Sequence, residues 1–138
     1  MRVAIHQPEY LSPLSLLDKA RQADVFVLLD DVQFNRASLQ HRAKIASPRA
    51  PFSWLTIPFV HNFGQFIKDV RIADHAWTER HKVLLREAYP DAPAAEAVMD
   101  QLRPFFDVKH ATVAEAAKAS MLLLFRIFGV KTCTVSSS

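Results

Sequence analysis

Cysteine and glycine are scarce in this chain, and their scarcity excludes several kinds of site. Among 138 residues there is one cysteine, Cys133, so a disulfide framework and a zinc site built from several cysteines are both excluded. The two glycines, Gly64 and Gly129, lie far apart, whereas phosphate loops and dinucleotide fingerprints need clustered glycines. No regular ligand spacing connects the histidines with the acidic residues, so we expect neither a metal nor a cofactor. A single cysteine fits a reducing, cytoplasmic compartment.

Long hydrophobic runs are missing as well. The N-terminus turns polar at His6, and the longest apolar run, 121–130, is interrupted by Arg126. These lengths are too short for a secretory signal or a membrane span, so we expect no membrane partner. Half of the residues are apolar and 22% are charged, a composition that supports a packed core. The length is that of one domain, which we place at 1–138.

Acidic residues are absent from one long stretch. Between Asp31 and Asp69 there is no aspartate or glutamate. Such concentrated positive charge favours an anionic small molecule, for example one that carries phosphate; a solvated basic loop is the alternative. The net charge of +3 is too small to indicate a nucleic-acid partner. The basic residues in this stretch are Arg36, Arg42, Lys44, Arg49 and Lys68.

The first 31 residues are typical of a strand–helix–strand unit. A β-branched strand at 3–5 ends at His6, a helix begins at Ser12-Pro13 with the serine as N-cap, and an apolar run follows at 25–29. A continuous apolar run predicts a strand that is covered on both faces. Ligands of such parallel sheets bind beyond the carboxyl ends of the strands, where this chain has His6-Gln7 and Asp30-Asp31.

The remaining chain completes an α/β fold. We predict a mainly parallel, Rossmann-like sheet with flanking helices and a small inserted antiparallel β excursion at about 32–72. Within the excursion, strands are expected at 42–46, 53–59 and 68–72. Helices are expected at 74–89, 93–106 and 112–129, the last with a Thr112–Glu115 capping box and Gly129 after its end, followed by a strand at 130–135.

Several polar residues are candidates for chemistry. His6 can act as a general acid or base near neutral pH, with Asp30 or Asp31 orienting it or the acceptor. Alternation along a strand places Arg42 and Lys44 on one face, where two cations suit a phosphate. Each candidate also has a structural interpretation. His6 would be a core histidine, the aspartates would cap loop N–H groups, and Arg42 with Lys44 would form a solvated basic face. Gln33 and Arg36 follow the acidic pair and either bind substrate or close a turn.

The strings VAIHQPEYL at 3–11 and ADVFVLLDDVQF at 23–34 resemble the WbqC-like family. So do QHRAKI at 40–45 and WLTIP at 54–58, and the later residues Trp77, His81, Tyr89 and 128–132 fall in the family's order. The resemblance implies a bacterial protein linked to polysaccharide or O-antigen assembly, with suspected acyl- or aminoacyl-group transfer. By position it implicates His6, Gln7, Asp30, Asp31, Gln33, Arg42 and Ser137.

The chain departs from that pattern in three places. Ser12–Ser15 replaces a segment that usually contains tryptophan and glycine, and His41 replaces a usual asparagine. Family chains also continue past the serines at 136–138, so we expect this chain to lack a C-terminal region. An incomplete layer would leave apolar surface, which predicts a homodimer that buries the helix at 112–129 or pairs the strand at 130–135.

Two functions follow as hypotheses. The first is an acyl- or aminoacyl-group transferase that acts on a phosphate-bearing donor or acceptor. The second is a non-catalytic binding or assembly module of a polysaccharide pathway. Convergence of His6, Asp30 or Asp31 and Arg42 on one pocket would favour the transferase, and their separation would favour the module.

Overall fold

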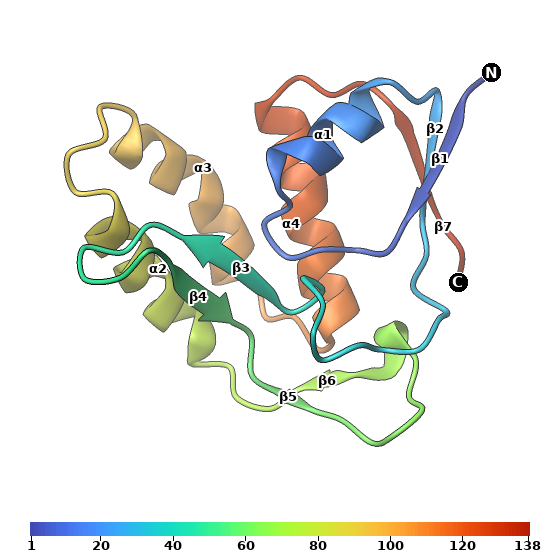
Figure 1. The fold of residues 1–138 in the computed structure, drawn as a ribbon, viewed down its shortest axis with the longest axis horizontal. Coiled ribbons are helices and arrows are strands. Elements are labelled where there is room, and N and C mark those ends of the chain that lie inside the picture. Colours follow the sequence, from blue (N-terminus) through green and yellow to red (C-terminus); the bar gives the residue numbers. More distant parts are fainter.

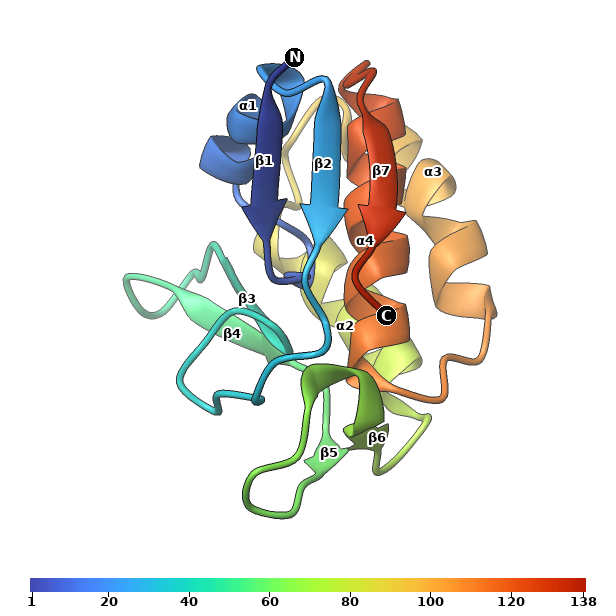
Figure 2. The same ribbon diagram turned by 90° about the vertical axis from the view of Figure 1, so that its right-hand side faces the viewer.

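The computed structural model describes residues 1–138, and its central element is a parallel sheet of three strands. The strands are β1 (Val3–His6), β2 (Val25–Leu28) and β7 (Cys133–Ser136), in the order β1-β2-β7 (Figure 2). Helix α1 (Leu14–Arg21) connects β1 to β2, which confirms the strand–helix–strand unit. The protein is thus a mixed α/β fold, and its parallel sheet is limited to these three strands.

Helices cover one face of this sheet. Phe26 and Leu28 of β2 pack against α1 and against α4 (Val113–Ile127), which lie behind the strands in Figure 2. On the strands that flank β2, Val3, Ile5 and Val135 are 52%, 54% and 43% exposed. The expectation that the apolar run at 25–29 is covered on both faces is therefore wrong for this chain, because buried residues alternate with half-buried ones along β2.

The antiparallel excursion at 32–72 is present as two small sheets. Strand β3 (Arg42–Ile45) pairs with β4 (Ser53–Thr56), and β5 (Phe59–Val60) pairs with β6 (Arg71–Ile72). The single strand expected at 53–59 is broken at Pro58, which has no N–H to donate to a ladder. A short 3-10 turn, η1 (Ile67–Asp69), precedes β6 and replaces the first half of the strand expected at 68–72.

Three further helices follow in the predicted order: α2 (Trp77–Ala88), α3 (Ala95–Asp107) and α4. The Thr112 N-cap of α4 is confirmed, since its hydroxyl accepts from the backbone N–H of Glu115 at 3.2 Å. The Glu115 carboxylate accepts in return from the N–H of Ala111, one residue before the position that a capping box uses. Gly129 follows α4 with φ +68°, a conformation that glycine adopts without steric cost. The expected N-cap of α1 is wrong: the Ser12 hydroxyl donates to the carbonyl of Glu9 instead, and Pro13 precedes the helix.

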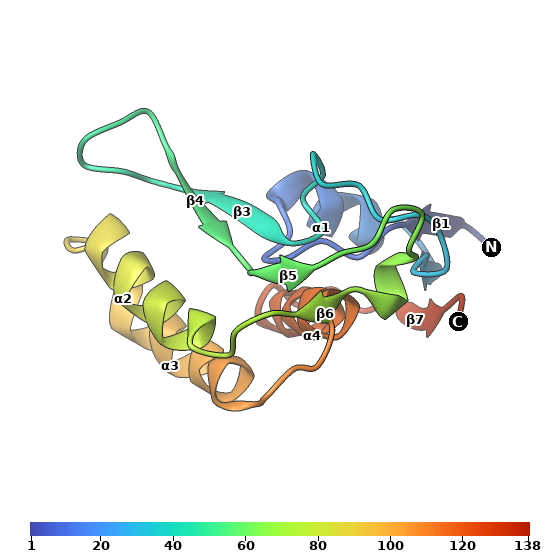
Figure 3. The ribbon, with the colours of Figure 1, turned by 90° about the horizontal axis from the view of Figure 1, so that it is seen from below.

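Helix α4 runs through the middle of the molecule (Figures 1 and 3) and contributes side chains to two hydrophobic cores. The larger core has 18 buried residues and includes Val113, Ala114, Ala116 and Leu123 of α4. The smaller core has seven and includes Met121 and Phe125 from the same helix. Most of α4 is buried within its own chain, although Leu122 is 44% exposed, so β7 is the more open of the two surfaces expected for a dimer. None of the helices has the length and hydrophobicity that crossing a bilayer requires.

Candidate functional site

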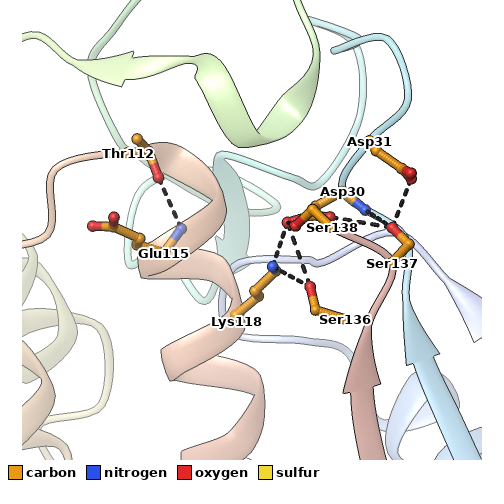
Figure 4. Close-up of polar contacts among 8 residues, drawn as sticks. All are labelled: Asp30, Asp31, Thr112, Glu115, Lys118, Ser136, Ser137 and Ser138. Atoms are coloured by element: carbon orange, nitrogen blue, oxygen red, sulfur yellow. Dashed lines mark hydrogen bonds and ion pairs between the residues drawn. The ribbon is translucent and has the colours of Figure 1, made fainter.

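Polar side chains gather at the carboxyl ends of β2 and β7 (Figure 4). Asp30, directly beyond β2, is 1% exposed, and its Oδ2 is ion-paired with Nζ of Lys118 from α4. Three consecutive serines at the end of β7 also lie near this carboxylate: Ser138 donates to Oδ2 at 2.7 Å, the Ser137 hydroxyl lies 3.2 Å from Oδ1, and that of Ser136 lies 3.5 Å from Oδ2. The buried carboxylate is therefore satisfied mainly by the Lys118 cation and the Ser138 hydroxyl, with two further hydroxyls beside it.

The charge state of this cluster follows from its partners. Burial acts to raise the pKa of Asp30, but hydrogen bonds from Lys118 and Ser138 outweigh it and hold that pKa below its ordinary value. Lys118 also donates to the Ser136 hydroxyl at 2.5 Å. Lys118 thus contacts Asp30 and Ser136 together. The cluster binds α4, β2 and β7 together through paired charges.

Asp31 and Ser137 complete this edge on its exposed side. The Ser137 hydroxyl lies 2.6 Å from Oδ1 of Asp31, and it also accepts from the backbone N–H of Asp30 at 3.2 Å. The structure thus brings together three of the predicted site residues, Asp30, Asp31 and Ser137. Lys118 was not among the predictions, although it is the only charged side chain between Glu115 and Arg126 of an otherwise apolar helix.

His6 ends β1 and has a different carboxylate beside it. Its Nδ1–H donates to the carbonyl of Gln7 at 2.8 Å, and this bond assigns the proton to Nδ1 and leaves Nε2 free. Oε1 of Glu9 lies 3.9 Å from that Nε2. Burial raises the pKa of Glu9, while His6 and Lys19 act to lower it. No hydrogen bond joins His6 to Asp30 or Asp31, so Glu9, which the sequence reasoning missed, is the carboxylate nearest to its free nitrogen.

Arg42 and Lys44 lie over the same aromatic residue, which confirms that they share a face of their strand. The Arg42 guanidinium is 4.1 Å from the Trp54 ring centre, and Nζ of Lys44 lies 5.3 Å from it and 4.4 Å from that of Phe52. Arg42 also donates to the carbonyls of residues 37 and 38 at 2.9 and 3.2 Å. These contacts fix the orientation of the guanidinium.

The two cations line a cavity of about 470 Å³ between β3, β4 and the loop that follows β1. That loop is held by its backbone: the N–H of Tyr10 donates to the carbonyl of Leu39, and that of Leu11 to the Ser120 hydroxyl, both at 3.0 Å. Leu11 has φ 44°, a strained value for a leucine, and such strain persists only where surrounding contacts enforce it. The lining residues are Tyr10, Leu11, Pro13, Ala37, Leu39, Arg42, Ala43, Lys44 and Trp54.

The other predicted binding residues lie outside this cavity. Gln7 accepts a hydrogen bond from Nε2 of Gln40 at 2.6 Å, which ties the end of β1 to the segment before β3. Arg36 lies 5.6 Å from the Phe59 ring centre, and its Nε donates to Nδ1 of His61 at 3.4 Å. Gln33 is exposed and forms an isolated bridge with Phe66. The cavity that Arg42 lines therefore includes neither His6 nor the aspartates of the carboxyl edge, and Gln33 and Arg36 belong to neither group.

An α/β domain with polar groups at the carboxyl edge of a parallel sheet defines a broad class of ligand-binding folds. Within that class, the model of the WbqC-like protein family matches residues 7–138, and the chain belongs to this family. It is also similar to the uncharacterized protein Rv1507c of Mycobacterium tuberculosis, with 23% identity over 139 residues. The match covers 99% of this chain but 60% of that relative. No solved structure matches.

The segments that carry the family resemblance contact one another in pairs. Gln7 bonds Gln40, and Arg42 lies over Trp54. The backbone N–H of residue 46 donates to the Tyr89 hydroxyl at 3.1 Å. These contacts join the loop after β1 to the segment before β3, and the β3–β4 hairpin to the C-terminal end of α2. Part of the family sequence pattern therefore maintains the fold that shapes the cavity.

Proposed function

We propose that this chain binds a phosphate-bearing small molecule in the cavity between the β3–β4 hairpin and the loop after β1. The observation that carries the proposal is the pair Arg42 and Lys44, which line a 470 Å³ cavity that has no acidic residue in its walls. Cavities of a few hundred Å³ with an apolar lining and few polar groups are the usual sites for small molecules. The ligand's anionic group would bind the two cations, and its less polar part would contact Leu11, Pro13 and Leu39.

The orientation of Arg42 supports this assignment. Two backbone carbonyls and the Trp54 ring hold the guanidinium in place, so little side-chain entropy is lost when an anion binds. These contacts occupy Nε and one N–H of Nη2, which leaves other N–H groups of the fork for a phosphate. Lys44 is exposed and supplies a second, adjustable charge.

A second candidate function is acyl- or aminoacyl-group transfer in a polysaccharide or O-antigen pathway, and the tautomer of His6 favours it. In that reaction an O–H or N–H of the acceptor attacks the acyl carbonyl carbon, and its proton passes to the free Nε2 of His6. The bond from that carbon to the leaving group then breaks, and the leaving group takes the electron pair. Asp31, which is exposed at the same edge, would orient the acceptor, whereas the buried Asp30 is already satisfied by Lys118 and the serines. The alternative is a module that binds without turnover, and the absence of His6, Asp30 and Asp31 from the cavity that Arg42 lines favours it.

Calorimetric titration with pyrophosphate tests the binding proposal. Arg42→Ala should weaken binding by about 1.5–3 kcal/mol, the value of a charge-assisted hydrogen bond. Arg42→Lys should bind with intermediate affinity, because lysine keeps the charge but loses the fork. Arg49→Ala is the matched control, since Arg49 belongs to the same acid-free stretch but not to the cavity. Equal affinities of wild type and Arg42→Ala, or equal losses in Arg42→Ala and Arg49→Ala, would refute a specific site.

Acetyl phosphate in the presence of an amine acceptor separates the two candidate functions. A transferase consumes it in a reaction that His6→Gln abolishes while pyrophosphate binding is retained. If the wild-type chain binds pyrophosphate but leaves acetyl phosphate intact, the binding module is favoured.

A further inference from the structure

The loop between β5 and β6 displays an aromatic side chain to solvent. Phe63 is 98% exposed at its tip, and Val60 and Phe66 are 58% and 44% exposed beside it. The loop is nevertheless ordered: Asn62 and Gln65 exchange two hydrogen bonds of 3.2 Å, and Gly64 takes φ +80° at the turn. An ordered loop that holds a large apolar side chain in water is typical of a contact surface. We name residues 60–66 the Phe63 loop.

Positive charge surrounds the base of the Phe63 loop. Arg36 donates to His61, and Arg71 is the strand partner of Val60. Lys68 follows in η1, and all three cations are exposed. Asp69 is the one carboxylate nearby in sequence, and the loop itself belongs to the acid-free stretch 32–68. Its partner surface should therefore be apolar at the centre and acidic at the rim.

A surface of this kind exists on the same molecule, between α2 and α3. An apolar cavity of about 340 Å³ lies there, and we name it the α2–α3 groove. The surrounding stretch 87–102 contains four acidic residues and no basic ones. Arg86 also lines the cavity, and Arg103 pairs with Asp100 at 2.7 Å, so acidic residues outnumber basic ones around the groove. The apolar lining consists mainly of Leu85, Tyr89, Pro90, Val98, Met99 and Leu102. The acidic residues are Glu87, Asp91, Glu96 and Asp100.

We propose that the Phe63 loop of one copy of this chain inserts into the α2–α3 groove of a second copy. The two features lie at opposite ends of the molecule, so one copy cannot fill its own groove (Figures 1 and 3). Two copies related by a two-fold axis exchange loops and fill both grooves. Phe63 supplies the apolar anchor, and Arg36, Lys68 and Arg71 face the acidic rim. This inference is independent of the proposed ligand cavity, which uses other residues.

Light scattering after size-exclusion chromatography, over about 5–500 µM, covers the affinities expected for a small interface. The wild type should pass from monomer to dimer with concentration. Phe63→Ser should weaken the dimer about tenfold or more, the effect of losing one buried aromatic anchor. Val98→Lys should do the same by placing a charge in the groove. Phe128→Ser is the control: Phe128 is 57% exposed, at the C-cap of α4, and its loss should leave association unchanged.

A mixture of the two variants provides the decisive measurement. Phe63→Ser keeps an intact groove, and Val98→Lys keeps an intact loop. Each variant alone lacks any productive contact, whereas the mixture restores one contact per pair and should recover part of the association, which falls as salt is added. A wild type that stays monomeric throughout, a Phe63→Ser variant that associates like wild type, or a mixture without recovery would overturn the proposal.

Discussion

The hydroxyl of Tyr10 donates a hydrogen bond to Nδ1 of His81 at 2.8 Å, and both side chains are almost fully buried. The direction of this bond follows from the other ring nitrogen, because Nε2–H of His81 donates to the carbonyl of Thr56 at 3.1 Å. The histidine is thus neutral, with its proton on Nε2. Through these two bonds it connects α2 to the loop after β1 and to β4, two of the elements that line the ligand cavity.

Loss of the Tyr10 hydroxyl should therefore destabilise the fold. Tyr10→Phe leaves Nδ1 of His81 buried without a partner, which should lower the free energy of unfolding by about 1–3 kcal/mol. Tyr89→Phe is the matched control, because the Tyr89 hydroxyl bonds an exposed backbone N–H. Urea unfolding of both variants measures these changes. Equal losses of unfolding free energy in the two variants would show that the buried Tyr10–His81 bond stabilises the fold no more than the exposed bond of Tyr89.

The protein should lose stability in mild acid. Burial lowers the pKa of His41 and of His81 from 6.5 to about 4, with Arg42 and Arg80 adding to the effect. Below pH 6.5 the unfolded chain takes up protons that the folded chain refuses, so stability is full above that value and falls toward pH 4. For each histidine the loss is on the order of 3 kcal/mol at most. Thermal unfolding at intervals from pH 7.5 down to pH 4 measures the loss, because this range passes the unfolded pKa of 6.5 and reaches the folded value of about 4.

His41 offers a way to assign part of this acid sensitivity. Its Nδ1 is buried without a partner, and its ring packs against Phe34 and Phe59 with centres 5.4 and 4.8 Å apart. His41→Phe should be nearly neutral at pH 7.5, since no side-chain bond is lost at Nδ1, and should reduce the fall in melting temperature on acidification. An unchanged pH profile would mean that His41 titrates normally.

The ion pair between Asp30 and Lys118 should contribute more to the free energy of unfolding than the neighbouring carboxylate of Asp31 does. Asp30→Asn removes the charge that Lys118 and the serines satisfy, and should cost about 3 kcal/mol at pH 7 because the lysine is left without its partner. Since the pKa of Asp30 is lowered on folding, this contribution is present above pH 3.8 and is lost as the pH falls through the folded value. Asp31→Asn, at an exposed position, should change stability by less than about 0.5 kcal/mol.

The Glu9 carboxylate, in contrast to that of Asp30, should lower the stability of the folded state at neutral pH. Burial raises its pKa, so the charged form is disfavoured by folding even though His6 and Lys19 attract it. Glu9→Gln should raise the melting temperature at pH 7, and the gain should shrink as the pH falls through the raised pKa, where the wild-type carboxyl is already protonated. A variant less stable than wild type at pH 7 would instead show that the attraction between Glu9 and His6 outweighs the cost of burying the Glu9 charge.

Local patterns foretold much of the fold. The strand–helix–strand unit, the Thr112 cap and the shared face of Arg42 and Lys44 all rest on residues within a few positions of each other. The partner of Asp30 could not be found in this way, because Lys118 is 88 positions away and reaches it only through the packing of α4 against the sheet. Burial of His41 is likewise set by Phe34 and Phe59, which come from other segments.

Helix α4 contributes side chains to both hydrophobic cores, so neither core can open while the other keeps its packing. Unfolding of either core would expose the α4 side chains that pack in it and so destabilise the helix that the other core needs. The chain should therefore unfold in one cooperative transition, with equal calorimetric and van't Hoff enthalpies, although its strands are divided among three separate sheets.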